Sequence, residues 1–144
     1  MTAVKQLLQN KGQAVWSVQP GDTVRSALQL MADKNVGALL VTEVDQLVGI
    51  FSERDYVRKV CLEGKIDLDT PISEFMTSHV FTITPENSIE ECMALMTEKH
   101  IRHLPVLKEG RLAGIISIGD VVKEVISDRE LMIQHLENYI TGRK

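Results

Sequence analysis

Hydrophobic and polar positions follow the same order twice along this chain of 144 residues. A short β-prone stretch ends at a proline, and apolar residues then recur at i, i+3, i+4 and i+7, which predicts a helix with one buried face. Two short apolar runs separated by a polar turn indicate a hairpin, and a second helix begins at the serine that follows. The pattern therefore predicts two copies of a β-α-β-β-α unit.

The two copies align without a gap at a shift of 65 positions. Residues 15–60 match residues 80–125, and 14 of the 46 pairs are identical, among them Gly49/Gly114, Ser52/Ser117 and Asp55/Asp120. A unit of this length does not easily bury both faces of its own sheet, so we expect the copies to pack about a pseudo-twofold axis with a related pair of clefts at their junction. The fold class expected is α+β, sandwich-like.

The pattern also places the elements and their boundaries. Ser88 and Glu91 form a predicted capping box, and Thr23 occupies the matching cap position in the first copy. We expect residues 1–62 to form the first copy with its lead-in segment at Val4–Leu8, residues 63–76 to form a linker with a lead-in turn at 72–76, and residues 77–144 to form the second copy. The expected elements are strands at 15–18 and 80–84, helical stripes at Val24, Ala27, Leu28, Met31 and at Ile89, Cys92, Met93, Met96, hairpins at 38–51 and 103–116, and second helices from Ser52 and from Ser117, the latter to about Ile140.

Composition narrows the classes of partner and compartment. The net charge is −4 with acids and bases interspersed, and the chain has only three Phe, two Tyr and one Trp, so a nucleic acid partner is not expected. No apolar run is long enough for a membrane span, and no signal peptide is visible, which favours the cytoplasm. Cys61 and Cys92 lie in apolar helical settings and form no C-x-x-C pair, so we expect a reducing compartment and buried thiols.

The strongest local signal is Gly49-Ile-Phe-Ser-Glu-Arg-Asp55, repeated as Gly114-Ile-Ile-Ser-Ile-Gly-Asp120. Amide groups at a helix start favour a phosphate, a serine hydroxyl adds a hydrogen bond, and an aspartate one turn in can accept two hydrogen bonds from a ribose diol. The two glycines would let a ligand approach the strand closely. The motif also has a purely structural interpretation, because S-x-x-D is a helix capping box and a duplication copies caps as well as sites.

Basic residues near both motifs favour the nucleotide interpretation. Arg54 and Arg58 lie one helical turn apart, and Arg102 and His103 enter the second hairpin, where their charges could neutralise a phosphate. No metal is expected, since His100 and His103 straddle a helix end and have no further ligand nearby. No catalytic motif is present, and a carboxylate beside helix amides should have a lowered pKa and be a poor base, so binding is favoured over catalysis.

The duplicated unit, the two S-x-x-D motifs, the Gly37–Val41 segment and the Arg102–Val106 segment resemble a pair of cystathionine-β-synthase (CBS) domains, also called a Bateman module. The likeness extends over nearly all of residues 15–125 and is close to stand-alone bacterial members. The resemblance implies binding of AMP, ADP, ATP or NAD(H), with S-adenosylmethionine as a rarer choice, and a homodimer formed through helices.

Residue by residue, the resemblance implies that Asp55 and Asp120 bind ribose and that Ser52 and Ser117 lie beside the phosphate. Glu53 and Arg54 replace Ile118 and Gly119 between the copies, so equal affinity at the two sites is not expected. In the first copy the positions that would line the adenine pocket are Ser17, Val18 and the segment Gly37–Leu40, of which Gly37, Ala38 and Leu40 are the candidates. In the second copy they are Thr82, Ile83, Arg102, His103 and Leu104.

Two functions follow from these observations. The first is a non-catalytic sensor module that binds an adenine nucleotide in the cytoplasm and alters contacts with another, unidentified protein. The alternative is a constitutive dimerisation scaffold in which the S-x-x-D motifs only cap helices, and the amphipathic run from Val121 to Ile140 favours it. An enzyme acting on nucleotides has the least support.

Overall fold

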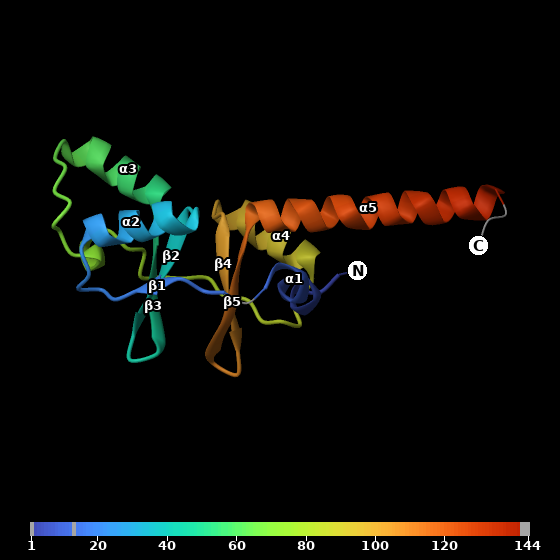
Figure 1. Cartoon of the computed structure of the whole chain (residues 1–144), viewed down its shortest axis with the longest axis horizontal. Coiled ribbons are helices and arrows are strands. Elements are labelled where there is room, and N and C mark those ends of the chain that lie inside the picture. Colours follow the sequence, from blue (N-terminus) through green and yellow to red (C-terminus); the bar gives the residue numbers. More distant parts are fainter. Residues whose placement is uncertain (1, 13, 142–144) are drawn as a thin grey trace. The chain divides into compact units, whose positions relative to one another are not determined.

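The computed structural model describes residues 2–12 and 14–141 and divides the chain into two compact units. One unit comprises residues 14–81, and the other comprises residues 1–13 and 82–144. Each unit contains one copy of the repeat, with a helix, a two-stranded hairpin and a second helix in the same order (Figure 1). The α+β class and the duplication expected from the sequence are both present.

The unit of residues 14–81 is built on a three-stranded sheet. Its elements are β1 (Ser17–Val18), α2 (Val24–Lys34), β2 (Ala38–Glu43), β3 (Gln46–Ser52), α3 (Glu53–Glu63) and a short 3-10 helix, η1 (Ile72–Glu74). Strand β1 pairs in parallel with β2, and β2 pairs antiparallel with β3. The apolar stripe of α2 faces this sheet, with Val24, Ala27 and Met31 fully buried, as the periodicity predicts.

The other unit repeats this order with α4 (Ile89–Lys99), β4 (His103–Lys108), β5 (Arg111–Ser117) and α5 (Ile118–Thr141). The strand predicted at 80–84 is reduced to one parallel bridge between Ile83 and Val106. In the first unit the amide of Leu40 donates to the carbonyl of Trp16, 3.3 Å away. The counterpart of Leu40 is Pro105, which has no N–H to donate, so the second unit cannot make this ladder bond.

Helix α5 packs beside α4 and then continues as one long helix, shown in red in Figure 1. It ends at Thr141, one residue beyond the predicted end. At the repeat shift of 65, the end of α3 at Glu63 corresponds to position 128, so residues 129–141 of α5 extend beyond the part that matches α3. Within the described chain, neither α5 nor any other helix is long and apolar enough to cross a membrane.

The two lead-in segments pack differently from the grouping expected along the sequence. Helix α1 (Val4–Lys11) packs on the second copy, where the amide of Val4 donates to the carbonyl of Asn87 at 2.9 Å and the side chains of Leu7 and Leu8 are buried. The lead-in turn at Ile72 packs on the first copy through the carbonyl of Asp22, 2.8 Å away. Each segment thus covers the copy that is not its nearer neighbour in sequence, because apolar surface rather than chain order selects its place.

The predicted helix caps are confirmed, but the predicted burial is wrong for one of the two thiols. Ser88 and Glu91 form the capping box of α4, and Thr23 accepts a hydrogen bond from the amide of Ser26. Cys92 is buried, and burial raises the pKa of its thiol to about 11. Cys61, however, is exposed, because α3 buries only its Tyr56 face.

Candidate functional site

Each S-x-x-D motif lies where a hairpin ends and a helix begins. The side chain of Ser52 accepts a hydrogen bond from the amide of Asp55 at 3.1 Å. The side chain of Ser117 accepts one from the amide of Asp120 at 3.2 Å. Both serines therefore cap a helix, and the structural interpretation of the motif is correct as far as the serines are concerned.

The first amide of each helix is also occupied by the chain itself. Glu53 donates its N–H to the carbonyl of Gly37 at 3.1 Å, and Ile118 donates to the carbonyl of Arg102 at 2.8 Å. These bonds fix the start of the helix to the start of the hairpin in both units. Each helix has three amides in its first turn, and two of them have these partners. In the described chain the third amide, that of Arg54 in α3 and that of Gly119 in α5, has no hydrogen-bond partner. The anion site expected at each helix start is therefore reduced to a single amide.

The carboxylate of Asp120 is tied to its surroundings on one oxygen. Its Oδ2 accepts hydrogen bonds from the amide of Ser117 at 2.8 Å and from the ammonium of Lys11 at 2.5 Å, and Lys11 also donates to the carbonyl of Ile115 at 2.7 Å. Burial raises the pKa of Asp120, but the hydrogen bonds and charge from Lys11 and Ser117 outweigh it and hold the pKa below its ordinary value. Asp120 is therefore ionised at neutral pH and a poor base, as expected from its position.

The carboxylate of Asp55 has a different partner. It receives one long hydrogen bond, 3.5 Å, from the hydroxyl of Thr77, and it does not fold back on the amide of Ser52. The first S-x-x-D motif is thus a simple serine cap, whereas the second is a full capping box. Asp55 remains more open to a ligand than Asp120, although both side chains are half-buried.

The expectation that the two glycines admit a ligand is wrong. A Cβ placed on Gly49 would lie 2.7 Å from Sδ of Met76 and 3.0 Å from the carbonyl oxygen of Thr77. A Cβ on Gly114 would lie 2.8 Å from a methyl carbon of Leu8. The close approach that requires glycine here is made by the lead-in segments of the chain itself.

The candidate adenine-pocket residues divide by burial. Residues whose side chains lie in the core can offer a ligand only their backbone; these are Val18, Ala38, Leu40, Ile83 and Leu104. Residues exposed at the strand ends are Ser17, Gly37, Thr82 and Arg102. Ser17, Thr82 and Arg102 can therefore recognise a ligand through their side chains, whereas Gly37 offers only its backbone.

The predicted cations are placed unequally. Arg54 and Arg58 are exposed on α3, while His103 is half-buried at the start of β4. Burial and the positive charges of Lys11 and Arg102 lower the pKa of His103, and Asp120 only partly offsets them. At neutral pH, His103 of the ligand-free protein is thus neutral. His100 ends α4 in a left-handed conformation, and no cluster of three metal-ligating side chains occurs among residues 2–12 and 14–141.

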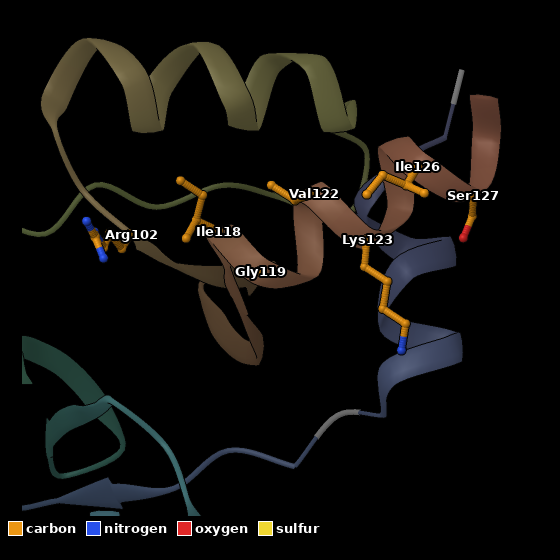
Figure 2. A pocket seen from close by; sticks show the side chains of 7 residues that line it. All are labelled: Arg102, Ile118, Gly119, Val122, Lys123, Ile126 and Ser127. Carbon is orange, nitrogen blue, oxygen red and sulfur yellow. The ribbon is translucent and has the colours of Figure 1, made fainter. Parts of the chain in front are cut away.

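A hollow of about 550 Å³ lies along the start of α5 (Figure 2). Ile118, Val122 and Ile126 line it at four-residue spacing, with Arg102 at one end, and Gly119, Lys123 and Ser127 complete the lining. Ser117 and Asp120 are not part of this lining, since Asp120 points toward Lys11 instead. The hollow is thus mainly an apolar surface of the helix, distinct from the capped carboxylate.

Two polar residues of the proposed sites lie outside the aligned residues 15–60 and 80–125 and were not predicted from the sequence. Lys11 contacts Asp120, and Thr77 contacts Asp55. The only signal available in the sequence was that the segments 11–12 and 76–77 hold equivalent positions at the shift of 65, just outside the aligned region. That shift alone could not indicate which copy each segment covers.

Comparison with known proteins identifies the repeat. The model of the CBS domain matches residues 8–61 and again residues 72–127. The CBS domain-containing protein CBSX3, mitochondrial, of Arabidopsis thaliana is 37% identical over 98% of this chain and 73% of its own length. The CBS-domain protein ATU1752 of Agrobacterium tumefaciens is 40% identical, with a TM-score of 0.82 over 85% of this chain and 98% of that one.

Two further solved structures are similar at lower identity. A hexameric CBS-CP12 protein from bloom-forming cyanobacteria is 29% identical, with a TM-score of 0.74 over 85% of this chain and 70% of that one. The CBS domain pair of protein MJ0100, in complex with 5′-methylthioadenosine and S-adenosylmethionine, is 21% identical, with a TM-score of 0.77 over 89% of this chain and 98% of that one. The likeness to MJ0100 is one of fold alone.

Proposed function

This chain belongs to the CBS-domain family and contains a pair of CBS domains, and on that premise we propose that it senses an adenine nucleotide and regulates another protein. CBS domain pairs generally bind adenosine-containing ligands for regulation. AMP, ADP, ATP and NAD(H) are the candidate ligands. The chain acts as a binding module rather than an enzyme, in the cytoplasm, and regulates a partner protein.

One observation supports the proposal most directly: the Asp55 carboxylate is not used to cap its own helix. Ser52 alone caps α3, so an acidic side chain one turn into the helix is not needed there for capping. Asp55 is half-buried, and a single long hydrogen bond from Thr77 holds it. A carboxylate with this much free acceptor capacity can accept both hydroxyls of a ribose.

The residues proposed to hold the nucleotide follow from this arrangement. Asp55 and Asp120 bind the ribose, and Ser52 and Ser117 lie beside the phosphate together with the open amides of Arg54 and Gly119. Exposed Arg58 and Arg102 supply positive charge. The backbone of Val18, Ala38, Leu40, Ile83, His103 and Leu104, with Ser17, Gly37 and Thr82, lines the adenine side.

Thermal unfolding in the presence of a ligand panel tests the proposal. Saturating AMP, ADP, ATP or NADH at a hundred times its dissociation constant should stabilise the protein by about 2.7 kcal/mol per occupied site. Asp55→Ala combined with Asp120→Ala should abolish the shift. Asp33→Ala removes an exposed carboxylate of α2 and serves as the matched control. An unchanged melting temperature across the panel, or a shift that survives the double substitution, would contradict the proposal.

A second function, a self-associating scaffold, is favoured by the exposed stripe of α5. Large apolar side chains remain accessible along this helix in the single chain, from 45% for Ile118 to 80% for Ile140. The others on this stripe are Val122, Ile126, Ile133 and Leu136. A homodimer through α5 would bury them. Native mass spectrometry of the wild type and of Ile126→Glu/Ile133→Glu tests this, since a monomeric wild type would exclude the scaffold.

A further inference from the structure

Lys11 lies in the second proposed site, although it comes from outside the repeat. It is the last residue of α1, and its ammonium group forms an ion pair with Oδ2 of Asp120 and a hydrogen bond with the carbonyl of Ile115. The side chains of Lys11 and Asp120 are 33% and 24% exposed. The ion pair is therefore partly exposed and within reach of a small molecule.

The contacts of Asp120 leave little room for a second set of donors on the same oxygen. A carboxylate oxygen has two lone pairs, and Oδ2 already accepts from Lys11 and from the amide of Ser117. Oδ1 has no hydrogen-bond partner in the described chain. A ribose diol that bridges both carboxylate oxygens must therefore displace Lys11, because the amide of Ser117 belongs to the helix cap and stays in place.

Among residues 2–12 and 14–141, the first site has no such competitor. At the shift of 65 the counterpart of Lys11 is Met76, an uncharged residue that packs against Gly49. Asp55 is contacted by the neutral hydroxyl of Thr77 at 3.5 Å, which is a weak hydrogen bond. The two carboxylates thus start from different states, one paired with a cation and one close to free.

We propose that Lys11 competes with the ligand for Asp120 and so makes the second site bind an adenosine-containing ligand more weakly than the first. This inference rests on the proposed function, since it concerns the same two carboxylates. A ligand that binds at Asp120 separates the Lys11 ammonium group from it, while the buried side chains of Leu7 and Leu8 keep α1 in place. Occupancy of this site is thereby coupled to the position of the Lys11 side chain.

Adenosine is the suitable probe because it carries the diol without the charge of a phosphate. Isothermal titration would measure the adenosine affinity of two variants. In Asp55→Ala only the second site binds, and in Asp55→Ala/Lys11→Met the second unit also carries the residue found at the equivalent position of the first. We expect the Lys11 substitution to tighten adenosine binding about threefold or more, the size of effect that a partly exposed ion pair produces. Lys5→Met, on the same helix, should leave the affinity unchanged, and 2′-deoxyadenosine should lose most of the gain.

Each outcome of this titration decides the matter. Tighter binding in the double variant, or binding that appears only there, supports the competition. Equal or weaker binding in the double variant overturns it and leaves the nucleotide function intact. If the wild type and all variants fail to bind adenosine and AMP, the proposed function itself is wrong and the competition falls with it. Lys11→Gln, with circular dichroism of every variant, guards against loss of folding.

Discussion

Lys11 and Thr77 make equivalent contacts in the two units. The ammonium group of Lys11 makes both contacts in one unit, whereas Thr77 uses its backbone amide for one and its hydroxyl for the other. Lys11 donates to the carbonyl of Ile115 at 2.7 Å and to Asp120. The amide of Thr77 donates to the carbonyl of Ile50 at 2.8 Å, and its hydroxyl donates to Asp55. The acceptors are equivalent at the shift of 65, so the two lead-in segments satisfy the same strand carbonyl and carboxylate by different chemistry.

This difference predicts unequal costs of removing the two side chains. Lys11→Met should destabilise the protein by about 0.5–1 kcal/mol at low salt, because a partly exposed ion pair is lost, and the cost should shrink at high salt. Thr77→Val should cost less, since the hydroxyl bond is long and the backbone amide contact remains. Urea unfolding of both variants at low and high ionic strength measures this, and a larger cost for Thr77→Val would contradict the comparison.

The paired glycines should respond unequally to alanine. In Gly114→Ala the new methyl group meets the end of the Leu8 side chain, which can rotate away. In Gly49→Ala it meets the backbone carbonyl of Thr77 as well as Met76, and the backbone cannot move without breaking the pairing of Thr77 with Ile50. We expect Gly49→Ala to cost about 1–3 kcal/mol and Gly114→Ala clearly less. Gly21→Ala, which meets nothing within 4 Å, is the control in chemical denaturation.

Serine substitutions separate capping from binding. Ser88→Ala and Ser117→Ala each remove a cap hydrogen bond and should each cost about 1 kcal/mol in the free energy of unfolding. Only Ser117→Ala should also weaken nucleotide binding, because Ser88 caps a helix outside the proposed sites. Parallel denaturation and ligand titration of the two variants check this. Equal ligand affinity in both would assign Ser117 to capping alone.

Tyr56 offers a substitution that should not destabilise the protein. Its ring packs between Phe51 and Phe75, with ring centroids 6.0 and 5.2 Å away. Its hydroxyl is buried and has no hydrogen-bond partner in the described residues. An unpaired buried hydroxyl costs about 1–3 kcal/mol, so Tyr56→Phe should be neutral or stabilising in thermal denaturation. A clear loss of stability would indicate that the hydroxyl has a partner.

His103 predicts how stability responds to acid. Its pKa is lowered in the folded protein, chiefly by burial. In the unfolded chain the pKa of His103 is near 6.5, so below that pH the unfolded state binds the proton more readily than the folded state does. Stability should therefore fall as the pH drops from about 6.5 through the lowered folded pKa. His103→Gln should flatten that part of the pH profile of unfolding. His135→Gln, at an exposed position of α5, should leave it unchanged.

The sequence by itself determined the elements of this protein. Two aligned copies with matching apolar periods, a capping box at Ser88 and serines at the hairpin ends were enough to predict the hairpins, the helices and the family, because these features depend on local spacing. The reduction of the strand at 80–84 to one bridge also follows from a residue visible in the sequence, Pro105, which has no N–H to donate.

Only the tertiary structure decided what surrounds the two carboxylates. The pattern could not show that α1 covers the second copy, because contact between distant segments depends on which surfaces fit and not on their order in the chain. For that reason Lys11 and Thr77 were missed, the role of Gly49 and Gly114 was misjudged, and Cys61 was expected to be buried. The equivalence of Asp55 and Asp120 in the sequence therefore conceals the difference in charge between their surroundings.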